Sequence, residues 1–204
     1  MVSIHILEPR FGMASNCYIA KSSDRYIIVD PSVSLDELYS QRNDLVGTVP
    51  NFVLLTHLHY DHIMGIESYS KAGVRIYISE EDGRHLQDPT YNCARFLGAG
   101  DFAFCGEYTP LQDGDHLSFG DESLVVMKTP GHTQGSVCFI GDGYAFTGDT
   151  IFEGGGYGRF DLPGGDASAL RLSLMQILKL PDETVIYPGH GGSSDIGRSK
   201  KYFY

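Results

Sequence analysis

Histidine and aspartate side chains gather in one short block of this sequence, and their types and spacing point to metal chemistry. The apolar run Phe52-Val-Leu-Leu55 is followed directly by three histidines and one aspartate, His57, His59, Asp61 and His62. Imidazole nitrogen and carboxylate oxygen are the ligands that zinc, iron or manganese ions accept from proteins. A solvated polar loop seldom combines three imidazoles with a carboxylate behind a buried strand, so we predict that this block binds metal.

The block is expected to remain extended beyond Leu55, so that alternate side chains point to the same side of the chain. His57, His59 and Asp61 would then converge, while His62 opens the next helix from a different angle. One short segment could in this way supply two nitrogen ligands to one metal ion, and an oxygen and a nitrogen to a second ion.

Three single residues in later motifs complete a set of seven candidate ligands. Two of them, His132 and His190, each end a Pro-Gly-His sequence, in which proline and glycine favour a tight turn at the end of a strand. The third, Asp149, has two carboxylate oxygens that could bridge ions held about 3.5–4 Å apart, as in other two-metal sites. Each of these residues alone would ordinarily be interpreted as a turn or helix-cap residue. Its occurrence in the same sequence as the first block is what favours a metal-binding role. We therefore predict two divalent ions.

The remaining histidines and the cysteines are assigned no chemistry. The histidines are interpreted as ordinary surface or core residues. The cysteines form no Cys-x-x-Cys pair and are expected to be buried, reduced thiols. These residues are His5, His85 and His116, and Cys17, Cys93, Cys105 and Cys138.

The elements that must position the seven residues are predicted from apolar periodicity, capping residues and turn residues. A capping box at Ser34–Glu37 should begin one helix, which Gly47 ends, and Asp166 should cap another helix, which Pro181 stops. A further helix is expected at 63–71. Strands are expected at 2–7, 17–20, 26–29, 52–55, 74–78, 123–129, 136–140, 144–147 and 184–187.

This order of elements predicts an α+β fold, a four-layer αββα sandwich in which two mixed β-sheets pack face to face with helices on both outer faces. The candidate ligands all come after strands, at loop ends where functional sites are commonly built. The 204 residues are expected to form one domain, residues 1–204. Residues 82–115, rich in glycine, proline, aspartate and cysteine, are expected to form a loop or lid insertion.

Composition and charge narrow the classes of partner. The chain carries 15 lysine and arginine residues against 26 aspartate and glutamate residues, a net charge of −11, whereas nucleic-acid binders are normally basic. No apolar run reaches the length of a membrane span, and the N-terminus lacks the basic flank and apolar segment of a signal peptide. We therefore expect a cytoplasmic protein that acts on a small molecule and binds neither nucleic acid nor membrane. The sequence leaves its oligomeric state open.

The motifs, in this order, resemble those of the metallo-β-lactamase superfamily, whose signature is His-x-His-x-Asp-His followed by single His, Asp and His ligands. The resemblance spans nearly the whole chain and is greatest to small glyoxalase II-like (hydroxyacylglutathione hydrolase-like) hydrolases. It rests on the segments Thr56–His62, Pro130–Ser136, Thr147–Thr150, Gly158–Asp166 and Leu180–His190.

The resemblance implies roles for individual residues. One ion would be held by His57, His59 and His132, the other by Asp61, His62 and His190, with Asp149 bridging them. Zinc is the expected metal, with iron, manganese and single-ion occupancy as alternatives. The loop 152–158 lacks the lysine and tyrosine that glyoxalase II uses against glutathione, unless Tyr157 and Arg159 substitute for them, and these two are therefore the candidate substrate-binding residues.

The predicted reaction is hydrolysis of a small acyl thioester by a metal-bound hydroxide, because a bound metal lowers the pKa of water toward neutrality. Asp61 is the candidate to orient that hydroxide and receive its proton. Glyoxalase II has an added C-terminal helical domain that grips glutathione, whereas this sequence ends 14 residues after His190, which leaves the thiol open. The nearest alternative is a mononuclear iron persulfide dioxygenase. A lactonase or β-lactamase and a non-catalytic metal-binding module are further alternatives.

Overall fold

The first β-sheet contains six strands in the order of the sequence. The computed structural model describes residues 2–9, 12 and 14–203. The first three strands pair antiparallel, and the next three add in parallel, so the residues that follow β3, β4 and β5 emerge at one edge of the sheet. The strands are β1 (Ser3–Leu7), β2 (Cys17–Ser22), β3 (Arg25–Val29), β4 (Phe52–Leu54), β5 (Arg75–Ser79) and β6 (Thr109–Leu111).

The second β-sheet also contains six strands, in the order β12-β11-β10-β9-β8-β7. Only β10 and β11 are parallel neighbours, and β9 runs opposite to both β8 and β10. The carboxyl ends of β8, β10 and β11 therefore share one edge. The strands are β7 (His116–Phe119), β8 (Glu122–Lys128), β9 (Val137–Gly141), β10 (Tyr144–Gly148), β11 (Val185–Pro188) and β12 (Ser194–Asp195).

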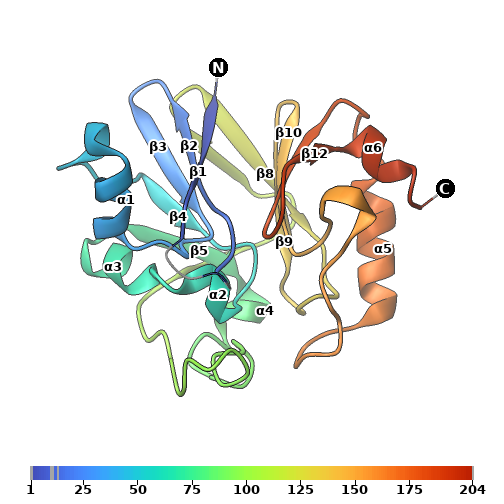
Figure 1. Cartoon of the computed structure of the whole chain (residues 1–204), viewed down its shortest axis with the longest axis horizontal. Helices are drawn as coiled ribbons and strands as arrows, with labels where there is room; N and C mark the ends of the chain where they lie inside the picture. Colours follow the sequence, from blue (N-terminus) through green and yellow to red (C-terminus); the bar gives the residue numbers. More distant parts are fainter. Residues whose placement is uncertain (1, 10–11, 13, 204) are drawn as a thin grey trace.

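The two sheets enclose a buried apolar core, in which Tyr18 and Leu54 of the first sheet pack in one cluster with Phe139 and Phe146 of the second. Separate apolar clusters join each sheet to its own helices. Figure 1 shows α1 and α3 outside the first sheet on the left, and α5 and α6 outside the second sheet on the right. The predicted αββα sandwich of two mixed sheets is confirmed.

The helices are short apart from α5, and two begin at the predicted caps. The Ser34 hydroxyl accepts from the Glu37 N–H, and the Asp166 carboxylate accepts from the Ala169 N–H at 2.8 Å. Among the residues described, no helix combines the length and apolar character needed to cross a membrane. The helices are α1 (Leu35–Gln41), α2 (Tyr60–Ile63), α3 (Ile66–Lys71), α4 (Glu80–Gly83), α5 (Ala167–Ile177) and α6 (Ile196–Lys200), with 3-10 turns η1 (Asn43–Leu45) and η2 (Glu153–Gly155).

Some boundaries differ from those predicted. The first helix ends at Gln41, and η1 rather than continued helix leads toward Gly47. The helix predicted at 63–71 is divided at Gly65, whose backbone packs so tightly on Val33 that a Cβ there would lie 2.5 Å from the Val33 carbonyl oxygen. The short elements β6, β7, β12 and α6 are additional to the predicted ones, because two to five residues are too few to show a clear period.

The segment 82–115 consists mainly of turns between α4 and β6, in agreement with the expected irregular structure. Its role as a lid and the single-domain boundaries 1–204 stay predictions. One cysteine prediction is wrong, since Cys105 in this segment is exposed. The other three, Cys17, Cys93 and Cys138, are buried free thiols as expected.

Candidate metal centre

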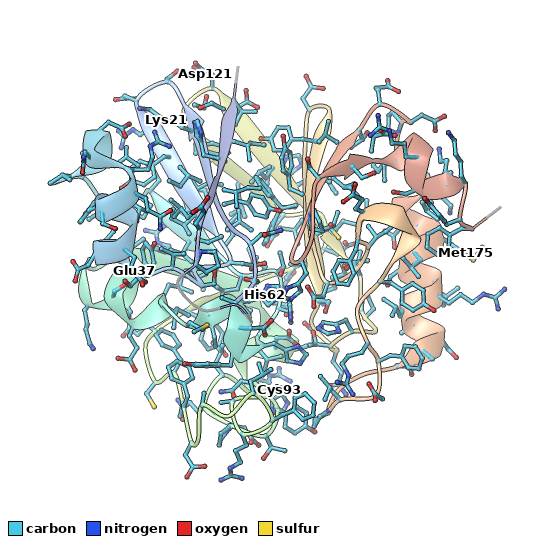
Figure 2. All side chains as sticks on the ribbon, in the orientation of Figure 1. Lys21, Glu37, His62, Cys93, Asp121 and Met175 are labelled. Atoms are coloured by element: carbon cyan, nitrogen blue, oxygen red, sulfur yellow. The ribbon has the colours of Figure 1, made fainter. Side chains whose placement is uncertain are left out.

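The ends of four strands carry the seven candidate ligands, and the sheet topology brings these ends together. Four ligands follow β4 of the first sheet, and the other three follow β8, β10 and β11 of the second. Figure 2 shows His62, one of the first four, between the lower ends of the two sheets. The centre is therefore built jointly by both halves of the chain.

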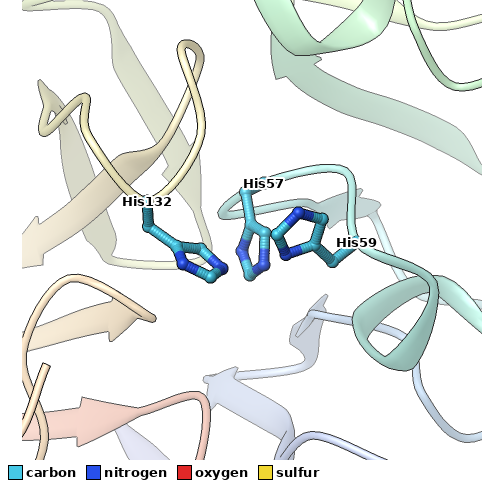
Figure 3. A group of neighbouring side chains, drawn as sticks. All are labelled: His57, His59 and His132. Atoms are coloured by element: carbon cyan, nitrogen blue, oxygen red, sulfur yellow. The ribbon is translucent and has the colours of Figure 1, made fainter. Parts of the chain in front are cut away.

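The first group consists of His57, His59 and His132, which face one another in Figure 3. Their candidate ligand atoms all lie within 4.8 Å of one another. The Nε2 atom of each ring is buried and has no hydrogen-bond partner among the described residues. The Nδ1 atoms of two rings are engaged instead, by Thr56 Oγ1 at 3.1 Å from His57 and by the Arg159 carbonyl at 2.6 Å from His132. A divalent ion would satisfy the three unpartnered nitrogens.

The second group consists of Asp61, His62 and His190, whose candidate ligand atoms also lie within 4.8 Å of one another. Asp61 Oδ2 is 3.1 Å from His190 Nε2 and 3.7 Å from His62 Nε2. The His62 side chain is fully buried, whereas that of His190 is 37% exposed. The second group is therefore open to solvent on the side of His190.

Asp149 lies between the two groups. One carboxylate oxygen, Oδ1, is buried, has no hydrogen-bond partner in the part of the chain that the structure describes, and lies 3.3 Å from His62 Nε2. The other, Oδ2, lies 3.5 Å from His132 Nε2 and 3.7 Å from His190 Nε2. A single carboxylate thus faces imidazoles of both groups, which is the position that a bridging ligand needs.

This arrangement agrees with what comparison with known proteins shows. The family model of the metallo-beta-lactamase superfamily matches residues 10–190. The chain belongs to the metallo-beta-lactamase superfamily. This confirms the family resemblance of the sequence motifs.

Relatives in the superfamily cover nearly the whole chain. Hydroxyacylglutathione hydrolase GloC of Haemophilus influenzae is 31% identical to it over 95% of this chain and 93% of that protein. The structure of BLEG-1 B3 metallo-beta-lactamase is similar with a TM-score of 0.87 and 28% identity, covering 98% of this chain and 97% of that one. The structure of TTHA1623 in a di-iron-bound form is similar with a TM-score of 0.83 and 29% identity, covering 95% and 96%.

The predicted backbone conformation of the histidine block is wrong in one part. The backbone is extended only as far as His59, and Asp61 and His62 both stand on the short helix α2. The helix turns Asp61 away from His57 and His59 and toward His190, with which the sequence analysis had grouped it. Among the described residues, the histidines assigned no chemistry, His5 among them, belong to neither ligand group.

Asp30 takes part in the centre although no sequence motif singled it out. It follows β3 with a positive φ of 52°, and its buried carboxylate lies 2.8 Å from His62 Nδ1. The same carboxylate accepts from the Thr56 N–H at 2.8 Å and from the Thr56 hydroxyl at 2.7 Å. Asp30 therefore fixes both the His62 ring and the start of the histidine block. An aspartate directly after a strand was the only available signal, and many turns share it.

Asp82 is a second buried carboxylate that the sequence did not reveal. It accepts from the Leu58 N–H at 3.1 Å, between two ligand histidines, and from the Thr133 hydroxyl at 2.7 Å. Its other oxygen accepts from the Gly135 N–H at 2.8 Å, and a Cβ at Gly135 would lie 2.5 Å from that oxygen. Asp82 thus ties the loop after β4 to the loop that carries His132.

Burial and mutual repulsion keep the first group neutral. Burial, followed by repulsion from neighbouring imidazoles, lowers the pKa of His57 well below its ordinary value and lowers that of His59 to about 3. Burial also lowers the pKa of His132, against the attraction of Asp149. Neutral imidazoles keep the lone pairs that a metal ion requires.

The second group is held by opposite charges. Burial disfavours the charged form of His62, but the carboxylates of Asp149, Asp30 and Asp61 outweigh it and raise the His62 pKa well above its ordinary value. Burial likewise disfavours ionised Asp149, but His62 above all holds the Asp149 pKa well below its usual range. The carboxylates of the centre accordingly stabilise a positive charge placed among them.

A cavity of about 320 Å³ opens over the centre. Five of the seven candidate ligands line it, together with Arg159 and apolar side chains. Of the two predicted substrate-binding residues, only Arg159 borders this cavity. Tyr157 is 46% exposed and lines a separate groove beside α5, so the structure does not bring it to the centre.

Proposed function

We propose that this protein is a metal-dependent hydrolase that cleaves a small acyl thioester. The observation that carries the proposal is the convergence of seven imidazole and carboxylate side chains, with Asp149 facing both groups. The relative named hydroxyacylglutathione hydrolase, 31% identical along nearly the full length of both chains, supports a thioester substrate.

In this proposal the first group holds one ion and the second group holds another, with Asp149 between them. Two divalent ions bound there would lower the pKa of a water molecule and polarise the substrate carbonyl. Zinc is the proposed metal, because it accepts imidazole nitrogen and carboxylate oxygen together. Iron is the alternative, since the similar structure of TTHA1623 was solved in a di-iron-bound form.

Asp61 is proposed to receive the proton of the attacking water. Its carboxylate borders the cavity and is 15% exposed. Burial raises the Asp61 pKa, but the nearby His62 and His190 outweigh burial and hold the pKa below its ordinary value. An ionised carboxylate that reaches the substrate cavity can accept a proton at neutral pH.

The test is hydrolysis of thioesters by purified protein loaded with zinc or with iron. Loss of the thioester absorbance should be followed directly, because the exposed Cys105 would react with a thiol reagent. We expect turnover by the wild-type protein and a loss of at least about a thousandfold in Asp149→Ala, which removes the shared carboxylate.

The matched control is His116→Ala, which removes an exposed histidine from β7 outside the ligand groups. This variant should keep wild-type activity. Equal rates for wild type and Asp149→Ala at full metal loading would contradict the proposal. Oxygen uptake with a persulfide substrate and iron would instead support a dioxygenase.

A β-lactamase is the second candidate function. It is favoured by the similarity to BLEG-1 B3 metallo-beta-lactamase, which covers 98% of this chain. The same preparations should be offered a chromogenic cephalosporin. Cleavage of the β-lactam by wild type but not by Asp149→Ala, with no thioester turnover, would favour this function over the first.

A further inference from the structure

The cavity over the metal centre has apolar walls. Phe96 and Leu97, from the irregular segment between α4 and β6, line the cavity together with Phe152 and Leu162, from the chain after β10. Phe96 is 62% exposed, although large apolar side chains usually avoid water. An exposed phenylalanine at the border of a concave site is well placed to be covered by a ligand.

The position of Phe152 also indicates that the cavity receives an apolar part of a ligand. Its ring packs edge-on against His190, with ring centroids 6.1 Å apart, so an apolar surface begins directly beside a candidate ligand. A substituent on the reacting carbonyl that extends away from the centre into the cavity would therefore contact apolar atoms. The cavity of about 320 Å³ lies at the small end of the usual range for ligand sites, which favours a compact group.

Arg159 is the only lysine or arginine among the described residues that line this cavity. Its guanidinium is already paired, with Nε 2.7 Å from Asp161 Oδ1 and Nη2 2.8 Å from Asp161 Oδ2. It also lies over the Phe96 ring, 5.1 Å from the centroid. A substrate carboxylate would have to compete with Asp161, which already accepts hydrogen bonds from two nitrogen atoms of this guanidinium.

We propose, resting on the thioester hydrolysis proposed above, that the cavity selects thioesters whose acyl group is apolar, larger than acetyl and still small enough for the cavity, on a thiol that carries no carboxylate. Phe96 and Phe152 cover the acyl group, and Asp161 balances the charge of Arg159, so the cavity attracts an anionic thiol such as glutathione only weakly. Phe96 is thus a specificity-determining residue.

The test compares acetyl, hexanoyl and phenylacetyl thioesters of N-acetylcysteamine, which is neutral, with the same acyl groups on glutathione. We expect kcat/KM to be about tenfold higher for hexanoyl and phenylacetyl than for acetyl on the neutral thiol, because added methylene groups are buried. We also expect each neutral thioester to exceed its glutathione counterpart by about tenfold.

Two variants separate the two parts of the proposal. Phe96→Ala should lower kcat/KM about tenfold for the hexanoyl and phenylacetyl thioesters and much less for the acetyl thioester, which removes the preference for the larger acyl groups. Asp161→Asn frees Arg159 and should raise kcat/KM for the glutathione thioesters about fivefold, with little effect on the neutral ones. Leu172→Ala, which removes an apolar side chain that is 67% exposed on α5 and does not line the cavity, is the matched control.

Binding of thioether analogues, measured by calorimetry, gives a readout that does not depend on turnover. S-hexyl-N-acetylcysteamine should bind about tenfold more tightly than S-hexylglutathione, and Phe96→Ala should abolish the difference from the S-methyl analogue. Equal binding, or a preference for the glutathione compound, would overturn the selectivity while leaving thioester hydrolysis standing. An absence of turnover on every thioester would instead overturn the proposed function.

Discussion

His62 is held in one orientation by a carboxylate on its far side. Its Nδ1 lies 2.8 Å from Asp30 Oδ2, while its Nε2 faces Asp61 and Asp149. Outer carboxylates of this kind orient metal-binding imidazoles and make them better ligands. Asp30 is therefore a positioning residue for the second group, and its effect should be visible in metal affinity.

Replacing Asp30 by asparagine should weaken binding of the second ion about 10–100-fold, because His62 loses the carboxylate that orients it. Binding of the first ion should weaken less, because Asp30 reaches His57 only through Thr56. The measurement is zinc titration in competition with a chelator. Asp24→Asn, at an aspartate whose side chain is 88% exposed, is the matched control and should bind both ions normally. Unchanged affinity for both ions in folded Asp30→Asn would contradict the assigned role.

For single residues, the residue type determined which members of the site could be predicted from the sequence. Histidines and aspartates grouped in motifs such as the one at His57 are conspicuous, and the structure brings all seven together. Asp30 and Asp82 are single aspartates whose importance depends on which distant N–H and O–H groups they meet. Arg159 was predicted to bind substrate, and in the structure its guanidinium is paired with the neighbouring Asp161.

At the scale of elements, the junction of β5 and α4 supports the first ligand group. Asp82, on α4, binds the loop after β4 through Leu58 and the loop after β8 through Thr133 and Gly135. Burial, against these hydrogen bonds, raises the pKa of Asp82 to about 6. The tie between the two loops is therefore sensitive to pH.

Asp82 should make the metal-free protein less stable as the pH rises. A raised folded-state pKa contributes stability that is full below the unfolded value of about 3.9 and is lost as the pH rises through about 6. Between pH 4 and pH 7 the free energy of unfolding of wild type should therefore fall by about 2 kcal/mol relative to Asp82→Asn. Urea denaturation of both proteins across this range measures the difference. A constant difference between them would contradict the raised pKa.

The elements were predictable where they are long or clearly capped. The capping residues Ser34 and Asp166 begin α1 and α5 as expected. The break at Gly65 was not predictable, because its cause is close packing on Val33, a residue 32 positions earlier in the chain. The expectation of an extended backbone through Asp61 was wrong for a local reason, since α2 begins at Tyr60, earlier than the pattern of apolar residues indicates.

At the scale of the whole molecule, the centre joins the two halves of the sandwich. The first sheet contributes the block after β4, and the second contributes His132, Asp149 and His190 from three strands whose carboxyl ends share one edge. Neither sheet alone supplies the whole first ligand group, because His57 and His59 follow β4 of the first sheet whereas His132 follows β8 of the second. Bound ions would therefore stabilise the packing of one sheet on the other.

The most direct test is calorimetric titration of the metal-free protein with zinc. The account predicts two equivalents per chain, one for each ligand group, with Asp149 shared between them. Binding of one equivalent or none by the folded protein would contradict a two-ion centre.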